Sequence, residues 1–111
     1  MNETVLCGAS GYEKKYYLNP MFASLPEGVR NELKILCVLY TEEFGGTLTL
    51  SFDKKGSLLL QTQYAEDDYG FDEIGSQMKI RQIQREKAEL LQALELYYKV
   101  FVLKQGMGAK S

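Results

Sequence analysis

The feature that most constrains this chain is an apolar repeat in its C-terminal third. The repeat positions are spaced alternately by three and four residues, which is the a/d seam of a heptad helix. They are Ile80, Ile83, Lys87, Leu90, Leu94, Tyr97 and Phe101. The pattern predicts one helix from about residue 72 to about residue 103, which would be roughly 45 Å long. A domain of 111 residues is narrower than that, so we expect the seam to need a second surface.

A second copy of the same chain is the simplest surface for this seam. We therefore predict a homodimer, with an unidentified protein partner as the other occupant. The apolar seam positions carry the predicted interface: Ile80, Ile83, Leu90, Leu94, Tyr97 and Phe101. Lys87 is the polar exception. It either fixes the register of helix pairing at a cost in stability or marks where the seam leaves the core. The seam does not distinguish parallel from antiparallel pairing.

The same region predicts two levels of burial along the helix. Residues 79–89 are mostly polar, so we expect them to be exposed apart from the seam. Residues 96–103 are apolar nearly all round, and we expect this end to be deeply buried.

The absence of histidine removes several classes of site. With no histidine in the sequence, Ser-His-Asp and Cys-His catalysis and every histidine-containing zinc site are excluded. Two cysteines cannot supply an all-thiolate zinc site, which needs four ligands. We therefore expect a protein without catalytic residues, a metal site or a cofactor.

The net charge and the hydropathy of the sequence limit the cellular compartment and the partners that we expect. The formal net charge of −2 gives no general attraction to nucleic acid or to acidic membranes. The longest apolar run covers residues 35–40, too few to cross a bilayer. The first residues lack the basic and apolar regions of a signal peptide. We expect a cytoplasmic protein, in which Cys7 and Cys37 are not expected to form a disulfide.

The remaining sequence predicts a single α+β domain over residues 12–104. Residues 1–11 are small and turn-prone and read as a flexible arm, and residues 105–111 read as a flexible tail. Residues 12–18 form either a third strand or the start of a helix. Residues 47–52 and 57–64 alternate between apolar and polar and predict an antiparallel hairpin.

A first helix is predicted between Pro26 and Gly45. Proline suits the first helical position, and glycine after the last turn ends a helix. The helix has apolar residues on one side and a second apolar patch of Ile35, Val38 and Leu39 on the other. A helix that is apolar on both sides is expected to be buried on both.

An acidic loop precedes the long helix and is the alternative functional site. Its predicted ligand-binding residues are Glu66, Asp67, Asp68, Tyr69, Phe71 and Asp72. Carboxylates at this density suit a hard divalent cation such as Ca²⁺ or Mg²⁺, although the EF-hand order of ligands is absent. The structural interpretation is a solvated turn in which Asp72 caps the helix. Tyr69 and Phe71 need something to pack on, which a ligand or a partner could supply.

A basic stretch follows the loop, at Lys79, Arg81, Arg85 and Lys87. Positive charges interleaved with apolar residues can face a phosphate backbone, but in an acidic chain of this kind we do not expect nucleic-acid binding. The stretch is better explained as a solvated helix face. Alternatively, two antiparallel copies could match the basic stretch of one to the acidic loop of the other.

Three short strings carry a resemblance to a known family. They are YEKKYYLNP at residues 12–20, TEEFGG at residues 41–46 and FDEIGS at residues 71–76. Together they resemble a family of short bacterial proteins of unknown function. The resemblance implies a bacterial cytoplasmic protein and brings no activity, cofactor or catalytic residue. From the sequence we therefore expect a non-enzymatic homodimeric interaction protein, with ligand or cation binding at the acidic loop as the alternative.

Overall fold

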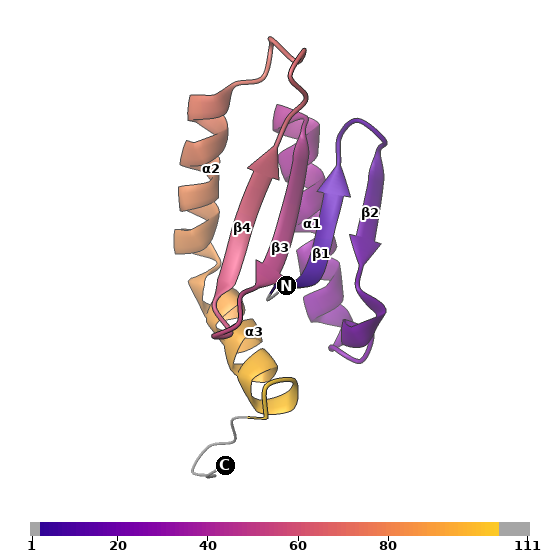
Figure 1. The fold of residues 1–111 in the computed structure, drawn as a ribbon, viewed down its shortest axis with the longest axis vertical. Coiled ribbons are helices and arrows are strands. Elements are labelled where there is room, and N and C mark those ends of the chain that lie inside the picture. The colour runs from indigo at the N-terminus through magenta and orange to yellow at the C-terminus, as the bar shows by residue number, and fades with distance from the viewer. Residues whose placement is uncertain (1–2, 105–111) are drawn as a thin grey trace.

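A computed structural model describes residues 3–104 of the chain (Figure 1). The predicted tail at residues 105–111 lies outside the described residues. The elements, in order, are β1 (Thr4–Ser10), β2 (Lys15–Leu18), the 3₁₀ turn η1 (Pro20–Phe22), α1 (Glu27–Phe44), β3 (Thr47–Phe52), β4 (Leu58–Gln63), α2 (Glu73–Glu86) and α3 (Ala88–Phe101). This arrangement confirms the predicted α+β class.

The strands form one antiparallel sheet in the order β2-β1-β3-β4. The helices lie behind and beside the sheet in Figure 1, whereas the face toward the viewer carries no helix of the described residues. Along β3, Leu48, Leu50 and Phe52 are fully buried under the helices. The predicted hairpin is confirmed: β3 pairs with β4, and Leu50 lies opposite Leu60.

The predicted flexible arm at residues 1–11 is wrong for Thr4–Ser10. These residues form β1, an inner strand that pairs with β2 on one side and with β3 on the other. Leu6 and Cys7 are fully buried. The small residues Gly8 to Ser10 have poor local strand propensity, so pairing on both edges decides the conformation. Residues 12–18 were predicted to form either a strand or the start of a helix. The structure has a strand there, because Lys15–Leu18 forms the outer strand β2.

Helix α1 begins and ends where the sequence predicts, but only one side of it is buried. Its inner side, including Leu33, Cys37 and Tyr40, packs on the sheet. The prediction of burial on both sides is wrong, because Ile35 and Leu39 on the outer side are each 57% exposed. Helices cover just one face of the sheet. No second layer of the described chain lies outside these helices to cover the outer side of α1.

The predicted single long helix is also wrong, because it divides at Lys87 into α2 and α3. Lys87 has φ −108° and ψ 23°, outside the helical range, and its ammonium lies 2.9 Å from the Glu32 carboxylate on α1. An exposed ion pair of this kind is worth at most about 1 kcal/mol. The ion pair is therefore too weak to set the bend by itself, and both halves keep apolar residues in the core, with Ile80 on α2 and Leu94 on α3.

The predicted deep burial of residues 96–103 is wrong for most of that end. Tyr98 is 3% exposed, but Leu96 is 51% and Phe101 64% exposed. The C-terminal half of α3 runs past the lower end of the sheet in Figure 1, so only the side that reaches back to the sheet is covered. The molecule is elongated, with a longest extent of 50 Å. This is longer than we expect for a compact domain of 111 residues.

Gly46 provides a test of the connection between α1 and β3. It has φ +63°, and a Cβ there would lie 2.6 Å from the Gln63 carbonyl oxygen. We expect Gly46→Ala to lower the free energy of unfolding by at least about 1–2 kcal/mol. Gly28, near the start of α1, has open space around it, so Gly28→Ala should stabilise the protein by up to about 1 kcal/mol. Urea unfolding of both variants measures this contrast, and equal effects would contradict it.

Candidate functional site

The structure separates the predicted interface residues into two groups. Ile80, Ile83 and Leu94 lie in the core of a single chain, at 3–7% exposure. Leu90 and Tyr97 are half-buried, and Phe101 is exposed. The first group therefore contributes to folding in this conformation, and only the second remains accessible to a partner.

The accessible group belongs to a larger apolar strip along one side of α3. With residues at helical spacing, the strip comprises Leu90, Ala93, Leu96, Tyr97, Val100 and Phe101. Ala93, Leu96 and Val100 were missed by the heptad pattern, because they lie beside its a/d line. The aromatic rings of Tyr97 and Phe101 pack together with centroids 5.0 Å apart, so the end of the strip is ordered by its own side chains.

The charged residues in the middle of α3 are directed away from this strip. Glu95 Oε2 accepts a hydrogen bond of 2.7 Å from the backbone N–H of Leu58 at the start of β4. The aliphatic part of Lys99 packs over Gly56 in the β3–β4 turn. Glu95 and Lys99 thus lie on the side of α3 that faces the sheet, and no residue of the strip is charged.

The acidic loop is held by contacts within the chain. The Tyr12 hydroxyl donates to Asp68 Oδ2 at 2.7 Å and accepts from the Ala65 N–H at 2.9 Å. Asp72 Oδ1 accepts from the Gly75 N–H at 2.9 Å, so it caps α2 as the structural interpretation expects. Two of the predicted ligand carboxylates are therefore engaged in the fold.

The two aromatic residues of the loop behave differently from each other. Phe71 stacks on Tyr64 with ring centroids 4.4 Å apart, which explains its place in an acidic segment. Tyr69 is 92% exposed and packs on nothing in the described chain. Within residues 3–104, no three histidine, cysteine or acidic side chains are grouped so that they could hold a metal ion.

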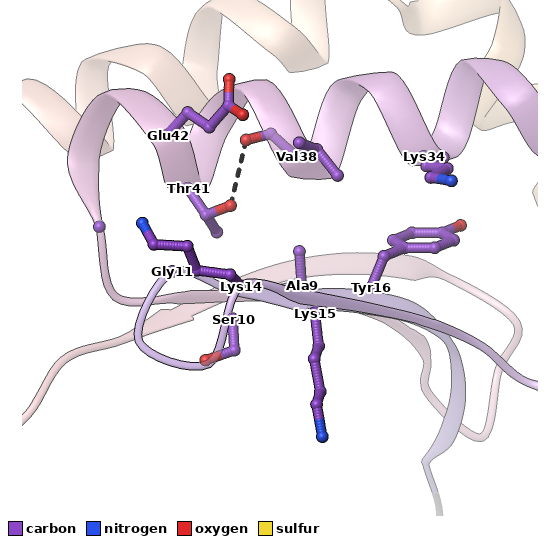
Figure 2. Close-up of a pocket in the computed structure, with 11 residues that line it drawn as sticks. Ala9, Ser10, Gly11, Lys14, Lys15, Tyr16, Lys34, Val38, Thr41 and Glu42 are labelled. Carbon is purple, nitrogen blue, oxygen red and sulfur yellow. Dashed lines mark hydrogen bonds between the residues drawn. The ribbon is translucent and has the colours of Figure 1, made fainter.

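A pocket of about 600 Å³ lies between the β1–β2 hairpin and the C-terminal half of α1 (Figure 2). Its walls are small or aliphatic at Ala9, Gly11 and Val38. Figure 2 shows the Tyr16 ring standing between strand and helix at one end, while the Lys15 side chain extends away from α1. No sequence pattern predicts this pocket, since its walls come from segments about thirty residues apart.

The polar groups of the pocket lie mainly at its rim. The side chains of Lys14, Lys34 and Glu42 are exposed. Thr41 is buried, but its hydroxyl already donates to the backbone carbonyls of its own helix. The Tyr16 hydroxyl is buried and has no hydrogen-bond partner within residues 3–104. Burial and the neighbouring Cys7 raise the pKa of Tyr16 well above its ordinary value, so this phenol stays protonated.

The acidic loop can be tested directly for cation binding. Because Asp68 and Asp72 are engaged elsewhere, we expect Ca²⁺ or Mg²⁺ at millimolar concentration to leave the melting temperature unchanged. Differential scanning fluorimetry with and without chelator measures this. A cation-dependent rise that disappears in the Asp67→Asn variant would restore the loop as a binding site.

Comparison with known proteins places the chain in a family. No curated protein and no solved structure matches it. Within the described residues, no helix is both long and apolar enough to cross a membrane. Residues 3–106 match a family of unknown function, DUF6145, over nearly the whole chain. The resemblance to a family without an assigned activity is confirmed, and the chain belongs to DUF6145.

Proposed function

We propose that this protein is a non-enzymatic interaction protein that forms a homodimer through the apolar strip of α3. The observation that carries the proposal is the exposure of large apolar side chains, led by Phe101 and Leu96, on a side of α3 that has no charged residue between Leu90 and Phe101. Soluble monomers rarely expose a contiguous apolar surface unless it binds something. The strip extends from Leu90 to Phe101, about 16 Å along the helix axis.

A second copy is the occupant that the strip fits best. A two-fold axis across α3 would place the same residues of both chains against each other, which is the commonest arrangement in homo-oligomers. The strip carries no charge that would be buried without a counter-ion on self-pairing. The position of the strip on the C-terminal helix also agrees with the accessible half of the predicted seam.

The size of the strip predicts a reversible dimer. Full burial of a large apolar side chain contributes about 1.5–3 kcal/mol, and several strip residues are already half-buried in the single chain. Association costs at least about 4 kcal/mol in lost translational and rotational freedom. The net gain is therefore small, and we expect a dimer that dissociates on dilution rather than a permanent one.

The test is the solution mass, by light scattering on a sizing column across concentrations of about 1–100 µM. We expect a shift from monomer, 12.6 kDa, toward dimer as concentration rises. Leu96→Asp places a charge at the centre of the strip and should abolish the shift without unfolding the chain, because Leu96 is exposed. Leu39→Asp is the matched control: it changes the same residue type at similar exposure on the outside of α1 and should leave the dimer intact.

Other results of this experiment assign a different mode of assembly. A monomer at every concentration contradicts the proposal. A dimer lost in high salt, but not in Leu96→Asp, indicates pairing of the basic residues Arg81 and Arg85 with the acidic loop, because salt screens charge pairs far more than apolar contacts. Equal loss in Leu96→Asp and Leu39→Asp also contradicts a specific role for α3.

A further inference from the structure

Cys7 and Cys37 meet in the core, although they are thirty positions apart in the sequence. Cys7 lies on the inner strand β1 and Cys37 on the sheet-facing side of α1, and both are fully buried. Both are free thiols, and their Sγ atoms are 3.9 Å apart. This is van der Waals contact between two sulfur atoms that belong to separate elements.

The surroundings of the pair differ from those of cysteines that only fill space. The sulfurs hydrogen-bond to each other. That bond from Cys37 lowers the pKa of Cys7 against the opposing effect of burial, and it combines with burial to raise the pKa of Cys37. Once one sulfur loses its proton, the other thiol can donate a hydrogen bond to the thiolate. We take Cys7, which lies next to Tyr16, as the sulfur that reacts first.

The pocket beside α1 is built from the same two elements, β1 and α1, that carry the thiols. Tyr16 lines the pocket and also lies close enough to Cys7 for the Cys7 charge to affect its pKa. Ala9 and Thr41, also in the pocket wall, are two residues after Cys7 and four residues after Cys37 on the same elements. Cys7 and Cys37 do not line the pocket themselves. Tyr16, which Figure 2 shows at one end of the pocket, is the lining residue next to Cys7, so a movement of its ring is the step that would have to expose the thiols.

We propose that Cys7 and Cys37 form a thiol–disulfide site that a small two-electron oxidant, such as hydrogen peroxide, converts into a cross-link between β1 and α1. A disulfide requires the sulfurs to approach to about 2.0 Å, which is a shift of roughly 2 Å from the present contact. Rotation about the side-chain bonds, with a small adjustment of α1 on the sheet, would have to supply this shift.

The reaction balances with one peroxide molecule for each pair. The Cys7 sulfur attacks one peroxide oxygen, the O–O bond breaks, and water leaves while Cys7 becomes a sulfenic acid. The Cys37 sulfur then attacks the sulfenic sulfur, the S–O bond breaks, and a second water leaves. Two thiols are oxidised to one disulfide, peroxide is reduced to two waters, and the two thiol protons end in those waters.

The experiment treats the folded full-length protein with hydrogen peroxide and follows intact mass and free thiols. We expect the free-thiol titre to fall from two per chain to none, with a mass loss of about 2 Da for the two hydrogens removed. Peptide mapping should join the Cys7 and Cys37 peptides. The melting temperature should rise by at least about 5 °C because the cross-link restricts the unfolded chain, and dithiothreitol should reverse the rise.

Two variants separate this site from ordinary core packing. Cys37→Ala should stop oxidation at the sulfenic or sulfinic acid of Cys7, seen as a mass gain, with no rise in melting temperature. Tyr16→Ala should speed formation of the cross-link by opening the route from the pocket. The proposal is overturned if the thiols of the folded protein stay unmodified and react only in urea, or if only disulfides between chains form.

Discussion

The attachment of Tyr98 to the sheet is the contact on which the arrangement of the C-terminal half depends. Its ring stacks on Phe52 of β3 with centroids 4.1 Å apart and an angle of 6° between planes. Its hydroxyl shares a hydrogen bond of 2.7 Å with Thr4 Oγ1 on β1. One side chain on α3 thereby holds both inner strands, and α3 must lie where Tyr98 can reach them.

The helix divides at Lys87 without changing the side that it turns toward the core. A straight continuation of α2 would have to keep one line of residues against the sheet over its full length. The buried positions are Ile80 and Ile83 on α2 and Leu91, Leu94 and Tyr98 on α3. At 3.6 residues per turn they lie on one such line, so the bend changes the direction of the helix axis and not the side that faces the core. The strip from Leu90 to Phe101 is left uncovered as a result, which connects the fold to the proposed homodimer.

The inner strand β1 links the other features of the molecule. It contributes Thr4 to the Tyr98 contact, Cys7 to the thiol pair and Ala9 to the pocket wall. None of these roles follows from its own residues: Gly8 to Ser10 are small and have little strand propensity, and the groups that Thr4, Cys7 and Ala9 meet are distant in the sequence. Hydrogen bonds to β2 and β3 on its two edges supply the stability that the local sequence lacks.

Local patterns in the sequence were sufficient to determine the β3–β4 hairpin, the limits of α1, the Asp72 cap and the α+β class. Each depends on residues near one another in the chain: strict alternation, a proline and a glycine at helix ends, and a carboxylate three residues before an amide. The place of β1, the bend at Lys87, the exposed outer side of α1 and the pairing of Cys7 with Cys37 were decided only by the tertiary structure. These features depend on which surfaces remain to be covered once the sheet has formed, and an apolar spacing alone does not say whether its partner is the same chain or another.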